Sequence, residues 1–137
     1  MTNSSSCCTP PICLTNPARL TQPYELPSPF EVETGTVFLH EPAWATAGEL
    51  RAQLLDESYP KPFVIDDGKS RFLYFNVRLM QSEMSLKTPN DLMLRYTQKM
   101  MAFLLFHPRP KRIVLIGLGG GSLVKFCHQR LPGAQMT

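Results

Sequence analysis

In Lys111-Arg-Ile-Val-Leu-Ile-Gly-Leu-Gly-Gly-Gly-Ser-Leu123 a short apolar run meets a cluster of glycines, and this segment is the most informative one about the architecture. Residues 113–116 are all β-branched or leucine, which is typical of a strand buried on both faces of a parallel sheet. Gly117, Gly119 and Gly121 follow at alternate positions. Glycine adopts positive φ and lets the main chain approach a ligand closely. A strand, a glycine turn and a following helix together predict a nucleotide loop.

The spacing of the glycines narrows the kind of ligand. The third glycine of the dinucleotide fingerprint G-x-G-x-x-G would fall at Ser122, so that pattern is incomplete. The spacing fits the nucleoside loop of S-adenosylmethionine-type enzymes better. The alternative is a tight strand-to-helix turn that binds nothing. The strand before the loop and the helix after it favour the ligand, which makes Gly117, Gly119 and Gly121 the candidate nucleoside-binding residues.

Composition excludes several classes of protein. The chain has 137 residues, 43% of them hydrophobic, and a net charge of +3, which is too small to indicate nucleic acid or membrane binding. The longest apolar run, 100–106, is too short to span a bilayer. The first residues lack a basic region followed by an apolar core, so we expect no secretory signal in them. Four cysteines without a C-x-x-C pair support neither a disulfide framework nor a metal site, so we predict reduced thiols and a cytoplasmic location.

Residues 1–30 are rich in proline, serine and threonine and predict a disordered tail. Residues 31–88 predict a small antiparallel β-subdomain with one helix and a hairpin. Its first strand is expected at 37–39. The helix should begin after Thr46 by a capping box and run to about residue 57, with Leu50, Leu54 and Leu55 at helical spacing. Trp44 is expected in the core or as an anchor for the tail.

Asp67-Gly68 separates two β-rich runs, Phe63–Asp66 and Lys69–Val77. Such a dipeptide predicts a hairpin with a type I′ turn, which needs positive φ at both central residues. Asp66 and Asp67 also allow a metal or catalytic interpretation. Turn chemistry alone places them there, so the turn is favoured. A third strand should end at 81–84.

Residues 89–137 predict a linking helix and the start of a nucleoside-binding domain. Thr88-Pro89 is a helix start signal, and the helix should carry an apolar face that includes Leu92 and Tyr96. A second helix is expected from about Ser122 to Arg130, with Cys127 as a core thiol. The fold class is therefore α/β: a small N-terminal antiparallel β-subdomain followed by the first β-α unit of a truncated Rossmann-like, S-adenosylmethionine-dependent methyltransferase-like domain.

Gln135-Met136-Thr137 resembles the first residues of a further strand, where the sequence stops. A β-α-β unit needs that second strand to bury its helix and close the site. The acidic residue that normally holds the ribose is then expected beyond Thr137. A truncated gene product, an engineered fragment and an incomplete gene would each explain this.

From Pro62 onward the chain resembles the N-terminal portion of the spermidine synthase (polyamine aminopropyltransferase) family, especially its bacterial spermidine synthase-like branch. The resemblance lies in Val64–Gly68, Gln81-Ser82, Leu94–Met101 with its Tyr96, and Ile113–Ser122. The order of a small β-domain, a linking helix and a glycine loop also matches. As a set these motifs are fairly specific, and each alone is weak.

The resemblance implies an aminopropyl transfer from decarboxylated S-adenosylmethionine to a polyamine such as putrescine, without a metal. It implies that Gly117, Gly119 and Gly121 line the nucleoside site. Gln81 would contact the nucleoside and the amine, and Tyr96 the amine. The catalytic residues are unknown within this chain, because the family's catalytic aspartate is expected beyond Thr137. A homodimer is the expected assembly.

The sequence also departs from the family pattern. Gly120 stands where the family usually has an aspartate, and Thr97 and Gln98 follow Tyr96 where His-Glu is usual. These changes remove charge from a pocket meant for a cation, and we expect this chain to be inactive alone. Two alternatives remain: a methyltransferase-like protein that uses ordinary S-adenosylmethionine, and a non-catalytic remnant or interaction module.

Overall fold

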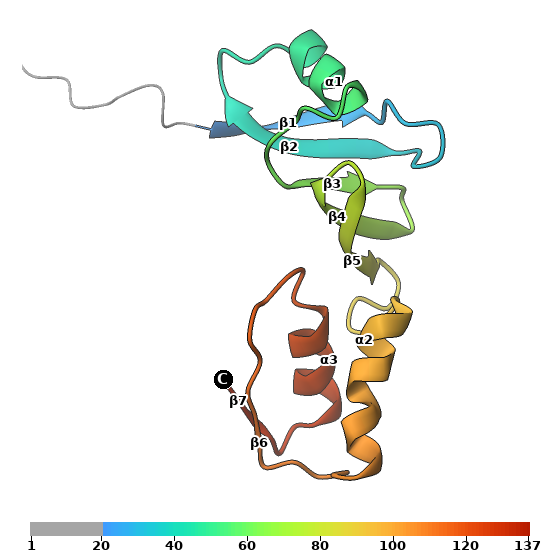
Figure 1. Ribbon diagram of the computed structural model, residues 1–137, viewed down its shortest axis with the longest axis vertical. Coiled ribbons are helices and arrows are strands. Elements are labelled where there is room, and N and C mark those ends of the chain that lie inside the picture. The colour runs from blue at the N-terminus through green and yellow to red at the C-terminus, as the bar shows by residue number, and fades with distance from the viewer. Residues whose placement is uncertain (1–20) are drawn as a thin grey trace, which may run out of the picture.

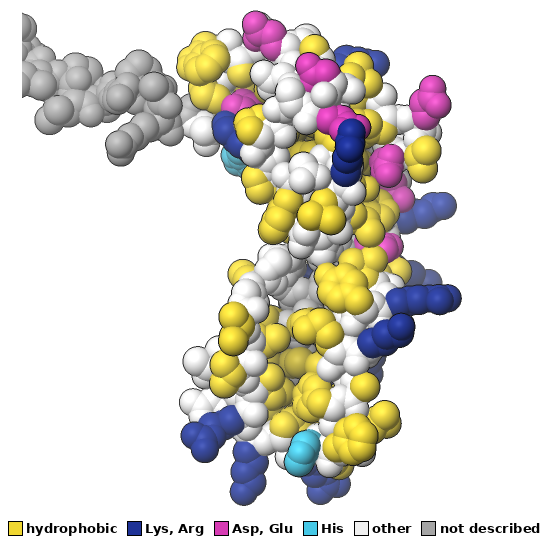
Figure 2. All heavy atoms as spheres, in the orientation of Figure 1, with side chains coloured by type: hydrophobic (Ala, Val, Ile, Leu, Met, Phe, Trp, Pro, Cys, Tyr) yellow, Lys and Arg dark blue, Asp and Glu magenta, His cyan; other side chains and the backbone are white. Residues whose placement is uncertain are grey.

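The computed structural model describes residues 21–137, and every structural statement below concerns these residues. It has two parts, which Figure 1 shows one above the other. The sheet part (21–85) is a five-stranded antiparallel sheet with one helix. The helical part (86–137) contains the other helices and a pair of parallel strands. Figure 2 shows the molecule narrowed where the two parts meet.

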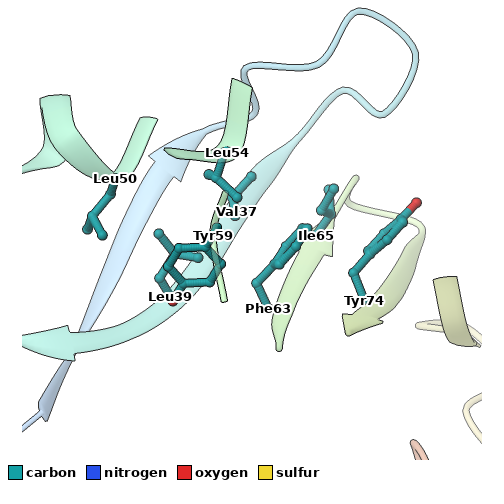
Figure 3. Packing of buried hydrophobic residues seen from close by; sticks show 8 residues of the cluster. All are labelled: Val37, Leu39, Leu50, Leu54, Tyr59, Phe63, Ile65 and Tyr74. Carbon is teal, nitrogen blue, oxygen red and sulfur yellow. The ribbon is translucent and has the colours of Figure 1, made fainter. Parts of the chain in front are cut away.

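The sheet has the strand order β1-β2-β3-β4-β5. Its strands are β1 (Thr21–Pro27), β2 (Thr36–Pro42), β3 (Phe63–Asp66), β4 (Ser70–Asn76) and β5 (Leu79–Ser85), and α1 (Ala47–Leu55) connects β2 to β3. Alternate residues of the central strands face α1, as the two-residue period of a strand requires. They form one core with α1 (Figure 3), made of Val37, Leu39, Leu50, Leu54, Tyr59, Phe63, Ile65 and Tyr74.

The prediction of a disordered tail over residues 1–30 is wrong for its last third. Thr21–Pro27 forms β1, which pairs with β2 in the register Leu26↔Val37. Pro23 and Pro27 are tolerated because β1 is an edge strand, where a missing N–H donor breaks no central ladder. The prediction for residues 1–20 lies outside the described residues.

The capping prediction for α1 is confirmed. Thr46 precedes the helix, and its Oγ1 accepts a hydrogen bond from Glu49 N at 3.3 Å. Leu50 and Leu54 are buried because residues four apart share a helix face. Leu55 lies one position further round and is 55% exposed, and Trp44 is 73% exposed, so the prediction that Trp44 belongs to the core is wrong.

The hairpin between β3 and β4 is confirmed, but its turn is not of type I′. Gly68 has φ 82°, whereas Asp67 is not at positive φ. The two carboxylates close the turn instead: Asp66 Oδ1 accepts from Gly68 N at 2.8 Å, and Asp67 Oδ1 accepts from Ser70 N at 2.6 Å. A hydrogen bond from Arg71 lowers the pKa of Asp66, and main-chain donors lower the pKa of Asp67. Both aspartates therefore have the turn role.

The linking helix begins later than predicted. Thr88-Pro89 forms a single turn in which Asp91 N donates to Thr88 O at 3.1 Å. Helix α2 (Arg95–Met100) starts after Leu94 and continues as a 3₁₀ turn, η2 (Met101–Leu105). The Asp91 carboxylate, which was predicted to favour the helix start, instead lies 3.3 Å from Arg130 Nη2 and forms an ion pair with it. Tertiary context thus replaces the local helix start signal.

The end of the chain forms a β-α-β succession. Strands β6 (Arg112–Ile113) and β7 (Gln135–Met136) pair in parallel, and α3 (Ser122–Arg130) connects them, as predicted. Pairing extends past β6, since Leu115 N donates to Thr137 O at 2.8 Å. Cys127 is fully buried, which raises the pKa of its thiol, so its assignment to the core is confirmed.

The prediction that residues 113–116 are buried on both faces is wrong. Val114 is 73% exposed and Ile116 is 100% exposed. Within residues 21–137, β6 has β7 as its single partner strand, so Val114 and Ile116 are not enclosed by a larger sheet. The observed architecture is thus mixed α/β, with an antiparallel sheet and a small parallel pair. No helix of residues 21–137 is long and apolar enough to cross a membrane.

Candidate functional site

The glycine loop after β6 has the backbone conformation that its sequence predicts. Gly117, Gly119 and Gly121 have φ values of 87°, 54° and 72°, all in the left-handed region. A side chain would strain each of these positions by roughly 1–2 kcal/mol. Gly121 N donates to Leu118 O at 2.9 Å and closes the turn. The three glycines are therefore required by the shape of the main chain.

The loop leads into a helix whose first amides are free of helical partners. The first helical hydrogen bond runs from Lys125 N to Gly121 O at 3.0 Å, so the N–H groups of residues 122–124 have no acceptor within α3. These groups carry the positive end of the helix dipole. A Cβ added at Gly117, Gly119 or Gly121 would meet nothing within 4 Å, so the space beside the loop is open.

A depression of about 380 Å³ lies beside the loop. It is found at the carboxyl ends of the two parallel strands, the edge at which open α/β sheets bind ligands. Its lining carries no charged side chain and consists of Leu115, Gly117, Leu118, Val124, Met136 and Thr137. An apolar floor beside main-chain donors suits a flat ligand that needs few hydrogen bonds.

The loop is packed against the last strand of the sheet. A Cβ added at Gly120 would overlap Ser82 of β5, with only 2.6 Å to Ser82 Cβ. The hydroxyls of Ser82 and Ser122 are 2.9 Å apart and share a hydrogen bond. Lys125 Nζ lies 2.8 Å from Met84 Sδ. Ser82 and Ser122 were not among the predicted site residues, because no local pattern connects two serines forty residues apart.

Gln81 and Tyr96, the two residues predicted at the junction, are brought together. The Tyr96 hydroxyl donates to Gln81 O at 2.9 Å, which joins α2 to β5. Tyr96 is 53% exposed and Gln81 is half-buried. Gln81 is also the neighbour of Ser82, which touches the loop. The structure thus joins Gln81 to Tyr96 and places Ser82 against the loop at Gly120, and the roles of the predicted residues toward a ligand stay predictions.

Charge is divided unevenly along the chain. Residues 92–137 carry seven Lys or Arg and no Asp or Glu, a net charge of +7, whereas residues 1–91 carry seven and eleven, a net charge of −4. Figure 2 shows Asp and Glu on the sheet part, and Lys and Arg toward the lower end. The residues that follow Asp91 therefore offer no carboxylate to a cationic ligand. Across residues 21–137, no group of three His, Cys, Asp or Glu side chains is placed to hold a metal ion.

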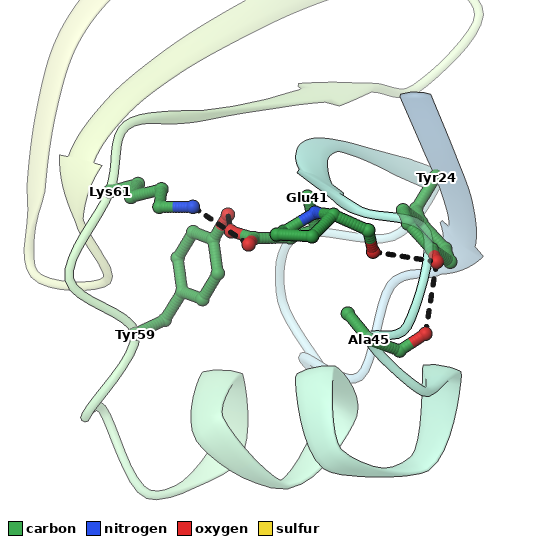
Figure 4. Close-up of polar contacts among 6 residues, drawn as sticks. Tyr24, Glu41, Ala45, Tyr59 and Lys61 are labelled. Carbon is green, nitrogen blue, oxygen red and sulfur yellow. Dashed lines mark hydrogen bonds and ion pairs between the residues drawn. The ribbon is translucent and has the colours of Figure 1, made fainter. Parts of the chain in front are cut away.

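Glu41 is a buried carboxylate elsewhere in the sheet part (Figure 4). The Tyr59 hydroxyl donates to its Oε1 and Lys61 Nζ to its Oε2, both at 2.7 Å. Burial raises the pKa of Glu41, but the two hydrogen bonds and the charge of Lys61 outweigh it and lower the pKa overall. Burial and the same hydrogen bond raise the pKa of Tyr59. Both carboxylate oxygens are occupied, so Glu41 connects β2 to the segment before β3 and is not a candidate for catalysis.

Comparison with known proteins gives a partial match. No protein-family model matches the chain, and no solved structure matches it. The polyamine aminopropyltransferase of Chromobacterium violaceum is 42% identical over 78 residues, which are 57% of this chain and 30% of that protein. The polyamine aminopropyltransferases of Neisseria meningitidis serogroups A and B are 36% identical over 80 residues, 58% of this chain and 30% of those proteins.

The match therefore covers much of one chain and little of the other. The aligned residues correspond to about 30% of the length of these curated relatives. It confirms the resemblance drawn from the motifs, at the level of a partial similarity. Over somewhat more than half of its residues, this chain is similar to an N-terminal portion of polyamine aminopropyltransferases.

Proposed function

We propose that this chain is the nucleoside-binding N-terminal portion of a spermidine synthase-like aminopropyltransferase. One observation carries the proposal: three glycines at positive φ lie between a parallel strand and a helix start, and the first of them, Gly117, lines an uncharged depression of about 380 Å³. The similarity to three polyamine aminopropyltransferases supports it. In this proposal, β6, α3 and β7 are the first unit of a Rossmann-like domain.

The reaction requires two substrates to be oriented. A primary amine of putrescine or a related polyamine attacks the carbon beside the sulfonium of decarboxylated S-adenosylmethionine, and methylthioadenosine leaves. The loop would hold the adenosine, with Gly117, Gly119 and Gly121 allowing close approach and the amides of residues 122–124 donating to its oxygens. Gln81 and Tyr96 would contact the substrates at the junction.

The amine must be held by carboxylates, which also help to take its proton. Residues 92–137 contain none, so we propose that this chain binds the nucleoside and does not catalyse the transfer by itself. The catalytic aspartate would belong to residues beyond Thr137. A cytoplasmic location, where the free thiol of Cys127 stays reduced, fits this proposal.

A second candidate is a methyltransferase-like protein that binds ordinary S-adenosylmethionine. The charge division favours it, because the carboxylate of that ligand would be attracted to a region with a net charge of +7. The decarboxylated ligand, which lacks that carboxylate, would be repelled by the same charge. The relative affinity for the two ligands therefore separates the two candidate functions.

Isothermal titration of the 137-residue chain with three ligands tests the proposal. We expect methylthioadenosine and decarboxylated S-adenosylmethionine to bind, and S-adenosylmethionine to bind more weakly. A preference for S-adenosylmethionine would favour the methyltransferase-like candidate. No binding of any of the three at millimolar concentration would reject both and leave a non-catalytic interaction module.

We further propose that the chain forms a homodimer. The face of the sheet away from α1 is open and has a depression of about 370 Å³, whose lining includes Phe38, His40, Val64, Arg71 and Leu73. Apolar side chains on this face would gain from burial against a second copy. Sedimentation equilibrium should give twice the mass of the chain, and a monomer at all concentrations would reject the dimer.

A further inference from the structure

Gly120 differs from the other glycines of the loop. Gly117, Gly119 and Gly121 are required by positive φ and have open space where a Cβ would be. Gly120 is not at positive φ, and its Cβ position is already filled by the side chain of Ser82. The fourth position of the loop is therefore glycine because β5 takes its space, which is a requirement of tertiary packing.

Ser82 is held firmly in that space. Its residue is only 8% exposed, and its hydroxyl shares a hydrogen bond with Ser122, the first residue of α3, at 2.9 Å. Leu73 of β4 is also near this point, with its Cδ2 3.8 Å from the Cβ position of Gly120. One side chain of the sheet part thus contacts both the loop and the helix start.

We propose that Ser82 is a positioning residue that sets the shape of the glycine loop. It excludes a side chain from position 120 and fixes Ser122 at the start of α3. The polar groups next to position 120 are then two neutral hydroxyls, those of Ser82 in the sheet part and Ser122 at the start of α3. Residue 120 itself contributes no side chain. The inference rests on the proposed function insofar as the loop is the nucleoside site.

A complementary pair of substitutions tests this directly. Gly120→Ala places a methyl group against Ser82, and overpacking of this kind typically displaces the main chain. We expect methylthioadenosine to bind at least about tenfold more weakly to this variant. Adding Ser82→Gly vacates the space, and the double variant should recover affinity to within about threefold of the single Ser82→Gly variant. Gly133→Ala is the matched control, because its Cβ would meet nothing within 4 Å, and it should bind as the unaltered chain does.

Ser82→Ala separates the hydroxyl from the bulk of the side chain. This variant keeps the Cβ that excludes a side chain at position 120, and it removes the hydrogen bond to Ser122. Loss of one such bond corresponds to about a three- to tenfold weaker affinity. The amide resonances of residues 117–123 should shift in this variant and in Gly120→Ala, and those of the core strand β3 should stay unchanged.

The amide spectra keep this inference separate from the proposed function. If the unaltered chain binds no nucleoside, the proposed function fails, and the spectra alone still decide whether Ser82 shapes the loop. Loop resonances that do not move in Gly120→Ala, or that are not restored by Ser82→Gly, would overturn the positioning role. A loss of affinity in Gly133→Ala equal to that in Gly120→Ala would overturn it as well.

Discussion

The sheet part and the helical part differ in how they bury apolar side chains. The sheet part has a continuous core of eight buried residues between α1 and one face of the sheet. Among the described residues of the helical part, only Leu92, Thr97 and Cys127 are buried. Many of its large apolar side chains are exposed, including Met93, Tyr96, Met100, Leu105, Phe106, Val114, Ile116 and Leu118. A helix on a five-stranded sheet encloses a core, whereas α2, η2 and α3 beside two short strands enclose little.

This difference indicates where stability and function are found. Stability should come mainly from the sheet part, because apolar burial is the dominant favourable contribution to folding. The candidate nucleoside loop belongs to the helical part and is held in place by β5 through Ser82 and Met84. The sheet part thus supports the loop, because the helical part itself has few buried side chains.

The largest expected effect is on the core of the sheet part. Leu54→Ala should lower the free energy of unfolding by about 2–5 kcal/mol, because a fully buried leucine leaves a cavity. Ile116→Ala, at a fully exposed position of the helical part, should change it by less than about 0.5 kcal/mol. Urea denaturation followed by circular dichroism measures both. Equal losses in the two variants would contradict the comparison.

The Glu41 network should give a smaller, pH-dependent effect. Glu41→Gln should cost about 1–3 kcal/mol at pH 7, because two hydrogen bonds to a charged group are weakened. The pKa of Glu41 is lower in the folded state, so its contribution is fully present above the ordinary value of 4.5 and is lost as the pH falls through the folded-state value. Urea denaturation between pH 7 and pH 3 should show a shallower acid loss in Glu41→Gln.

Glu25→Gln is the matched control for that experiment. Glu25 is exposed on β1, so its removal changes the net charge without breaking a buried contact. It should leave both the stability at pH 7 and the acid profile close to those of the unaltered chain. If the free energy of unfolding falls as steeply with acid in Glu41→Gln as in Glu25→Gln, then ionised Glu41 does not stabilise the folded state.

Two glycines at positive φ, one in each part, separate backbone strain from function. Gly68→Ala in the hairpin and Gly119→Ala in the loop should each cost about 1–2 kcal/mol, since both have open space and a left-handed φ. Of the two variants, only Gly119→Ala should abolish measurable methylthioadenosine binding. Calorimetry gives the stability and titration the affinity. Equal affinities in the two variants would remove the loop from the nucleoside site.

The smallest effect on stability is expected at the exposed strand of the helical part. Ile116→Lys should leave the free energy of unfolding within about 0.5 kcal/mol, because the side chain is fully exposed. It should reduce any association that uses the apolar face of Val114, Ile116 and Leu118. Sedimentation velocity at increasing concentration measures this. Unchanged self-association would show that this face is not used.

Elements with strong local signals were predicted well. The Thr46 cap, the hairpin around Asp67-Gly68 and the bounds of α3 depend on residues close in sequence. The start of the linking helix was predicted wrongly at Thr88, although the signal there was equally strong. Asp91 forms an exposed ion pair with Arg130, 39 residues away, in place of a role in a first helical turn, and helix propensity is a local preference that tertiary context often overrides. Likewise, β1 was missed because pairing with β2 stabilises a proline-containing edge that propensity alone disfavours.

The glycine turn could be predicted from local residues alone, because only glycine adopts positive φ at 117, 119 and 121 without strain. Three features emerge only from the folded chain: the reason that residue 120 is glycine, the contact of Tyr96 with Gln81, and the exposure of Val114 and Ile116. These features depend on which segments, distant in sequence, come into contact. For Gly120 the contact is with Ser82 of β5, and no pattern of residues near 120 predicts it.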